Sequence, residues 1–133
     1  MESSKAAGRA AMQRGDHPSA IAAFEQALAH APGDVWLLDA LGFLYFCQGR
    51  FEDARDCCLR SIALSPDNNY AHKGLGLCLA RLGDPDAGIA ALRRSLELDS
   101  GYADAHHDLG VVLSEVGRNE EAEQCFARAR ALR

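Results

Sequence analysis

The sequence predicts an all-α fold, an α-solenoid of four helix-turn-helix repeats, on three observations. Two sets of glycines recur with a period of 34 residues, and a fixed period of roughly 20 to 50 residues indicates a repeat architecture. The sets are Gly8, Gly42, Gly76 and Gly110, and Gly15, Gly49, Gly83 and Gly117. Apolar residues in each period fall at helical spacing, and no segment alternates apolar and polar residues long enough for a useful strand.

The period divides residues 1–133 into one domain of four blocks without insertion or deletion. The blocks are 1–34, 35–68, 69–102 and 103–133. Further columns of mostly apolar or small residues keep the same register and are predicted to form the core between helices. These columns are Ala7, Leu41, Leu75 and Leu109; Ala11, Tyr45, Leu79 and Leu113; Phe24, Cys58, Leu92 and Phe126; and Ala27, Ser61, Ser95 and Ala129.

Each block is predicted to form two helices joined by a glycine turn. In the second block the apolar spacing breaks at Gly49, which suits a left-handed helix end, and the helix that follows ends by Pro66. In the third block Asp84 can cap a helix that begins at Pro85. A glycine inside a helix costs about 1 kcal/mol relative to alanine. The glycine column that begins at Gly8 therefore predicts close approach of each partner helix.

The second block also carries a family resemblance. The pattern Leu38-x-x-Leu41-Gly42-x-x-Tyr45, then Ala54-x-x-x-Cys58 and Pro66, resembles the tetratricopeptide repeat, and the other blocks echo it. The resemblance covers the whole chain. It implies a right-handed superhelix whose first helices line a concave groove. Cys58 departs from the family pattern, which usually has an aromatic residue there.

The groove residues are predicted to be those that lie out of phase with the core columns on each first helix. They are Glu2, Lys5, Arg9 and Met12; Trp36, Asp39, Phe43 and Phe46; Tyr70, Lys73, Leu77 and Arg81; and Asp104, His107, Val111 and Glu115. Five of them, Trp36, Phe43, Phe46, Tyr70 and Leu77, are expected to form an apolar patch. Lys5, Arg9, Lys73 and Arg81 should flank it. Inward packing of Trp36 or Phe46 as core is the alternative.

An apolar patch with a polar rim is typical of a protein-binding site. The sequence therefore predicts a non-enzymatic protein-interaction module that binds a helix or an extended peptide of a partner in its groove. Acidic residues of that partner would meet the four cations of the rim.

Two known groove types of the family are disfavoured. Arg9, Ala40, Tyr70 and Gly74 do not fit a carboxylate clamp, although Lys5 does. Ala6, Ala40, Gly74 and Asp108 stand where O-GlcNAc transferases carry an asparagine ladder.

Composition and motifs argue against other classes of protein. The net charge is −5, and the longest basic run is Arg93-Arg94, so no nucleic-acid partner is predicted. No apolar stretch approaches the ~20 residues of a membrane span. Five cysteines without a secretory signal indicate free thiols in a reducing, cytoplasmic compartment. His106 and His107 are adjacent on a helix and cannot easily share a metal, and no glycine-rich loop precedes a helix in the order that cradles a phosphate. No catalysis, cofactor or metal is therefore predicted. His72 and His106 are expected to face the interior between helices.

The rival prediction is a homo-oligomer formed through the last helix pair. No polar helix follows Asn119 to Arg133 in the sequence, and repeat arrays usually need polar caps. This pair is therefore expected to leave apolar residues partly uncovered, namely Leu109, Val112, Leu113, Phe126 or Leu132. A third possibility is that the chain is a fragment of a longer repeat protein.

Overall fold

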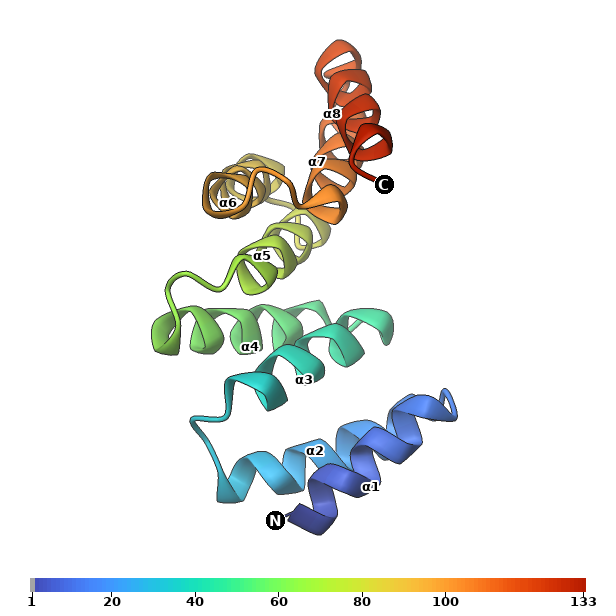
Figure 1. Cartoon of the computed structure of the whole chain (residues 1–133), viewed down its shortest axis with the longest axis vertical. Helices are drawn as coiled ribbons and strands as arrows, with labels where there is room; N and C mark the ends of the chain where they lie inside the picture. The colour runs from blue at the N-terminus through green and yellow to red at the C-terminus, as the bar shows by residue number, and fades with distance from the viewer. Residues whose placement is uncertain (1) are drawn as a thin grey trace.

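The computed structural model describes residues 2–133, with side chains from Ser4 onward. Over that range the chain forms eight helices and no strand (Figure 1). The helices are α1 (Glu2–Gln13), α2 (His17–His30), α3 (Val35–Cys47), α4 (Phe51–Leu64), α5 (Asn69–Arg81), α6 (Pro85–Leu98), α7 (Ala103–Glu115) and α8 (Asn119–Ala131). Each helix packs against the next in the chain, and the termini lie at opposite ends of an elongated stack. The predicted α-solenoid is confirmed.

Short turns and caps set the helix boundaries. Gly15, Gly49, Gly83 and Gly117 all have positive φ, between 73° and 94°, and they end the first helix of each pair as predicted. The α6 boundary is also confirmed, because Asp84 accepts a hydrogen bond from the Ala87 N–H at 3.2 Å ahead of Pro85. Asp34 and Asn68 cap α3 and α5 in the same way.

Buried residues form two clusters along the stack rather than one central core. The first cluster spans α1 to α4 and includes Cys78 of α5, and the second spans α6 to α8. Most predicted core columns are buried. Ala7 is exposed, and Leu75, Leu79 and Phe126 are half-buried. Ala7 and Phe126 lie in the terminal pairs, where a neighbour covers one side only.

The predicted close approach at the helical glycines holds at three of the four positions. A Cβ added at Gly8 would overlap the Phe24 ring, and one at Gly76 or Gly110 would lie 2.6 Å from Leu92 or 2.7 Å from Phe126. The prediction is wrong at Gly42, where the nearest atom would be the Cys57 Cβ at 3.6 Å. The reason is the residue in the facing column, which is Cys58 here.

The C-terminal pair is better covered than the sequence predicted. Leu109, Val112 and Leu113 are buried between α7 and its neighbours, and only Phe126 and Leu132 remain half-buried. The outward residues of α8 are largely charged or small, with Glu120 and Glu121 in the first turn and Arg128 and Arg130 in the last. The expectation of an uncovered apolar end is therefore wrong for three of its five residues.

Candidate functional site

The first helices of the pairs, α1, α3, α5 and α7, present a common face, here called the groove face. Backbones of α3 and α5, and of α5 and α7, approach each other directly. The structure buries none of the predicted groove residues whose side chains it describes, and Glu2 lies outside those side chains. Trp36, Phe43 and Tyr70 are 41%, 46% and 37% exposed, and together they form an exposed apolar patch on this face.

Two hollows lie next to each other on this face. The N-terminal hollow has a volume of about 430 Å³ and is lined by Met12, Trp36, Asp39, Ala40, Phe43 and Tyr70. The central hollow, of about 280 Å³, is lined by Asp39, Gly42, Phe43, Phe46, Cys47, Cys58, Tyr70, Ala71, Lys73, Gly74, Leu77, Cys78 and Asp108. Asp39, Phe43 and Tyr70 line both, so the hollows form one groove over α1, α3, α5 and α7.

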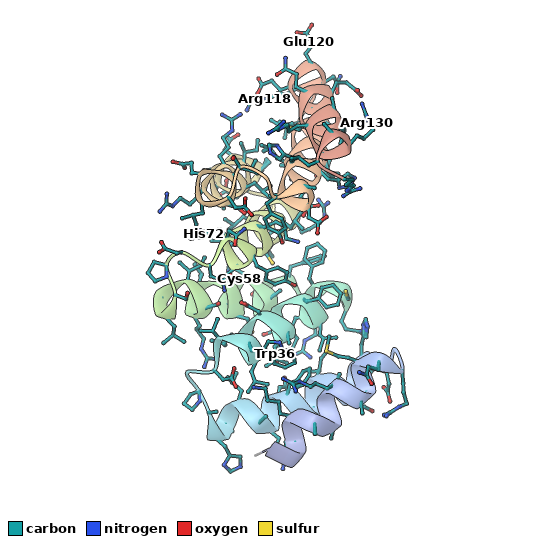
Figure 2. The ribbon with its side chains drawn as sticks, in the orientation of Figure 1. Trp36, Cys58, His72, Arg118, Glu120 and Arg130 are labelled. Carbon is teal, nitrogen blue, oxygen red and sulfur yellow. The ribbon has the colours of Figure 1, made fainter. Side chains whose placement is uncertain are left out.

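Small residues create the central hollow. Position 58 holds a cysteine where the same column has Phe24, Leu92 and Phe126, so no large side chain fills the space beside Gly42. Gly74 lines the same hollow, and its missing side chain lets α5 lie close to Cys58, since a Cβ there would be only 3.1 Å from the Cys58 Sγ. Cys58 lies between α4 and α5 (Figure 2). A small residue in a column of large ones was the sequence signal for this hollow.

Trp36 is partly core and partly groove. Its indole packs against the buried Phe24 ring in a T-shaped arrangement, with centroids 5.4 Å apart, and the side chain lies between α3 and the α1–α2 pair (Figure 2). Lys5 Nζ and the Arg9 guanidinium lie over the ring at 5.2 and 4.7 Å. Phe46 is half-buried against the first core cluster and meets Phe51 edge-on. The alternative of inward packing therefore holds in part for both residues.

Lys5 and Asp39 occupy equivalent positions on successive first helices, α1 and α3. Each contacts the residue that caps the start of the next first helix, 29 positions later in the sequence. Lys5 forms an ion pair with Asp34 at 2.8 Å. Asp39 accepts from Asn68 Nδ2 at 2.9 Å, and also from Ser61 Oγ at 2.8 Å. Hydrogen bonds from Lys5 and the Leu37 N–H hold the pKa of Asp34 below its usual value, although burial opposes this. These bridges fix the spacing between neighbouring first helices.

Three of the four rim cations already have carboxylate partners in the chain. Lys5 pairs with Asp34, Lys73 Nζ lies 3.6 Å from Asp108, and Arg81 lies 2.9 Å from Glu115. Acidic residues of a partner would therefore compete with a carboxylate of the chain at these three cations. The two members of each ion pair between α5 and α7 lie about one repeat apart in the sequence, and that spacing could have predicted these pairs.

The remaining predicted groove residues lie toward the α7 end. Leu77 and Val111 are half-buried, and His107 is exposed with its ring 5.5 Å from that of Phe126 on α8. His72 and His106 do not fill the interior as predicted. Each is half-buried, and its Nε2 lies 2.9 Å from a loop carbonyl oxygen six residues earlier, of Pro66 and Ser100.

The cysteines near the groove are free and show no metal-binding arrangement. Contact with Cys78 and burial raise the pKa of the Cys58 thiol, whereas the contact with Cys58 lowers the pKa of Cys78. Burial raises the pKa of Cys57, which lies outside the groove, to about 11. Thiols held in the neutral form are poor nucleophiles. Among the described residues, no group of three or more histidines, cysteines or acidic residues could hold a metal ion.

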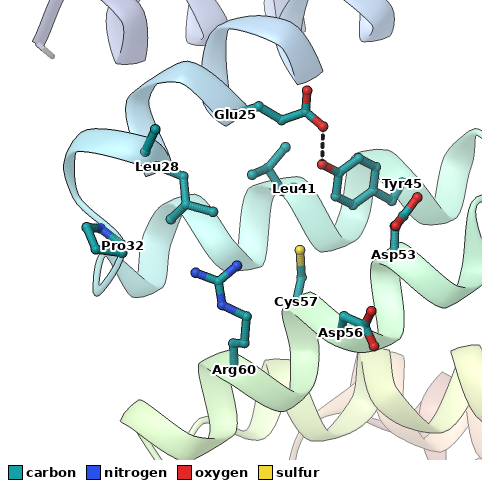
Figure 3. Close-up of a pocket in the computed structure, with 10 residues that line it drawn as sticks. Glu25, Leu28, Pro32, Leu41, Tyr45, Asp53, Asp56, Cys57 and Arg60 are labelled. Atoms are coloured by element: carbon teal, nitrogen blue, oxygen red, sulfur yellow. Dashed lines mark hydrogen bonds between the residues drawn. The ribbon is translucent and has the colours of Figure 1, made fainter.

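A further hollow of about 440 Å³ lies outside the groove face, between α2, α3 and α4 (Figure 3). Its polar groups are mostly engaged within the chain. The Tyr45 hydroxyl donates to Glu25, and Asp53 and Asp56 pair with Arg50 and Arg55. The aromatic groove therefore offers more groups for recognition than this hollow.

Four stacked helix pairs with a hollowed face on their first helices define an α-solenoid repeat protein of the interaction-scaffold class. Three family models, each described as "Tetratricopeptide repeat", match residues 2–44, 40–103 and 79–133, and together they cover the described chain. The chain belongs to the tetratricopeptide repeat family.

The chain spans only a small part of the curated relatives that it matches in sequence. It is 34% identical over 88 residues to tetratricopeptide repeat protein 7A of Homo sapiens, a match that covers 66% of the chain and 10% of that protein. It is 28% identical over 117 residues to the probable N-acetylglucosaminyltransferase SPINDLY of Hordeum vulgare, covering 83% of the chain and 12% of the enzyme. A crystal structure of MamA superposes with a TM-score of 0.83 at 27% identity, covering 97% of the chain and 70% of MamA.

The match to an enzyme carries no catalytic assignment, because it covers so small a share of SPINDLY and the repeat fold is generally a non-catalytic interaction module. Within residues 2–133, no helix is both long and apolar enough to cross a membrane.

Proposed function

We propose that this chain binds a segment of a partner protein, helical or extended, in the groove over α1, α3, α5 and α7. One observation carries the proposal. Three exposed aromatic rings, those of Trp36, Phe43 and Tyr70, line the same hollow. Aromatic residues concentrate binding energy at interfaces, since they bury a large area at a small cost in side-chain entropy. Apolar side chains of the partner would fill the two hollows.

A paired substitution tests the proposal. A random peptide library is selected on the wild type and on the Trp36→Ala, Phe43→Ala double variant, and the same two proteins are used as baits for partner capture. Because aromatic hot spots each contribute about 2 kcal/mol or more, the double variant should weaken groove-bound peptides by at least about 100-fold. Since Trp36 also contacts Phe24, thermal melts and Phe43→Ala alone separate lost binding from lost stability.

The matched control lies on a second helix. Leu59 and Leu64 of α4 are 47% and 53% exposed and line none of the hollows described above. A Leu59→Ala, Leu64→Ala double variant removes comparable apolar surface and should leave peptide binding unchanged. If the two double variants lose the same peptides, or if neither loses any, the groove is not the binding site.

Self-association is the competing proposal. It relied on an apolar C-terminal end, and the burial of Leu109, Val112 and Leu113 removes much of that surface. Light scattering at high protein concentration decides between the two. A monomer eliminates the competing proposal, whereas a dimer that Phe43→Ala dissociates would make a second copy the occupant of the groove.

A further inference from the structure

The groove face carries a carboxylate, that of Asp39, which forms no ion pair with a cation of the described chain. Its oxygens accept hydrogen bonds from Ser61 and Asn68, and both donors are neutral. The equivalent junction before it pairs Lys5 with Asp34, so the charges there cancel. Asp39 is half-buried, and a charge with a reduced water shell attracts a counter-ion more strongly than an exposed one.

Phe43, beside Asp39, offers an aromatic face without a cation over it among the described side chains. Lys5 and Arg9 lie over Trp36, and Lys73 lies over Tyr70 at 5.1 Å. Among the described side chains Phe43 forms one aromatic pair, a T-shaped one with His17 at 6.4 Å between centroids, and it is the most exposed phenylalanine, tyrosine or tryptophan. The faces of aromatic rings attract ammonium and guanidinium groups.

The charged residues that line the central hollow also favour a cationic side chain. Asp39 and Asp108 contribute two negative charges and Lys73 contributes one positive charge, which leaves a net charge of −1. The remaining lining residues are apolar apart from the thiols and the Tyr70 hydroxyl. An alkyl stem fits such a surface, and lysine and arginine bury their stems while keeping their charged ends at polar groups.

We propose that the partner segment places a lysine or arginine side chain in the central hollow, with its stem against Phe43 and its charged group at Asp39. This inference rests on the proposed function and specifies the chemistry of the partner. It also reverses the sequence-based expectation of an acidic partner, since three of the rim cations are engaged within the chain.

The test is a double-mutant cycle on selected peptides. Peptides are selected from a random library on the wild type after depletion on the Trp36→Ala, Phe43→Ala variant, and the best one is synthesised with its basic residue and with methionine in that place. On the wild type, anisotropy titrations should show about a tenfold loss for the methionine peptide. On Asp39→Asn the two peptides should bind within about twofold of each other.

Two further variants keep the result interpretable. Asp104→Asn makes the same charge change on the groove face, but Asp104 pairs with Arg133 at 3.3 Å and lines neither hollow, so the tenfold preference should persist. Phe43→Leu removes the ring without touching the hydrogen bonds of Asp39, and it should reduce the preference even if Asp39→Asn unfolds the chain.

The possible outcomes distinguish failure of this inference from failure of the proposed function. If no selected peptide depends on the groove, both this inference and the proposed function fail. If groove-dependent peptides carry no basic residue, or if the methionine penalty is unchanged in Asp39→Asn and Phe43→Leu, this inference fails and the proposed function stands. If Asp39→Asn weakens both peptides equally, Asp39 has only a structural role, and the inference is overturned.

Discussion

The junction between α2 and α3 and the junction between α4 and α5 join equivalent helix pairs by different means. At the first, large side chains span the space between the pairs. Trp36 packs on Phe24, Tyr45 donates to Glu25, and no backbone contact joins α1 to α3. At the second, small residues such as Cys58 and Gly74 bring the helices together, and α3 directly contacts α5.

This difference shows how a repeat array gains a binding groove without losing its register. The second junction keeps its geometry through the hydrogen bonds of Asp39 with Ser61 and Asn68, so its inner space can remain unfilled. The first junction depends on a few bulky residues. Since stability in such arrays is approximately a sum over repeats and interfaces, the α1–α2 pair should be the more sensitive to loss of a single side chain.

The largest expected effect on stability comes from replacing the equivalent residues of the two junctions, Phe24 and Cys58, by alanine. Phe24 is fully buried, and Phe24→Ala should cost about 3–5 kcal/mol of unfolding free energy. Cys58→Ala removes one sulfur beside an existing hollow and should cost about 1 kcal/mol. Urea unfolding followed by circular dichroism measures both values, and hydrogen exchange should locate the loss caused by Phe24→Ala in α1 and α2. Equal costs would contradict the contrast between the junctions.

Adding a methyl group should have opposite signs at Gly8 and Gly42. The Phe24 ring occupies the space of a Cβ at Gly8 and cannot move freely, so Gly8→Ala should destabilise by about 1–3 kcal/mol. The Cβ of Gly42→Ala would meet Cys57 at an ordinary 3.6 Å, and better helix propensity should stabilise by up to about 1 kcal/mol. Thermal melts of the pair decide. A loss of stability in both would mean that the space beside Cys58 is unavailable.

Much of this architecture was predictable, because the 34-residue register fixes helix turns and core columns. The ion pairs across the groove face were harder to predict, although Arg81 and Glu115 lie one repeat apart and therefore on adjacent first helices. Helical phase places Lys73 on the face but does not say that its charge is used by Asp108. The central hollow depends on two small residues, Cys58 in a column of large residues and Gly74 opposite it, and only the packed helices show that the two face each other.

The ion pair at the first junction should give a smaller effect that depends on pH. Asn retains the cap on α3, so Asp34→Asn removes mainly the interaction with Lys5, at a cost of about 1 kcal/mol at neutral pH. The pKa of Asp34 is lower in the folded chain, so its stabilisation is present above the unfolded pKa of about 3.9 and is lost as pH falls through the folded value. Unfolding at stepped pH should show wild type and variant converging in acid, and a difference that persists there would exclude the ion pair as its cause.

The smallest expected change in stability comes from Cys58→Phe, which restores a large residue to its column at the second junction. Apolar burial against Gly42 favours the ring, whereas contact with Gly74 and Cys78 opposes it, so the net change should stay within about 1 kcal/mol. The ring would occupy the floor of the central hollow. The variant should therefore melt close to the wild type and yet lose the groove-bound peptides, because the helices keep their places while the space between them is filled. A variant that melts normally and binds those peptides unchanged would show that the partner does not enter this hollow.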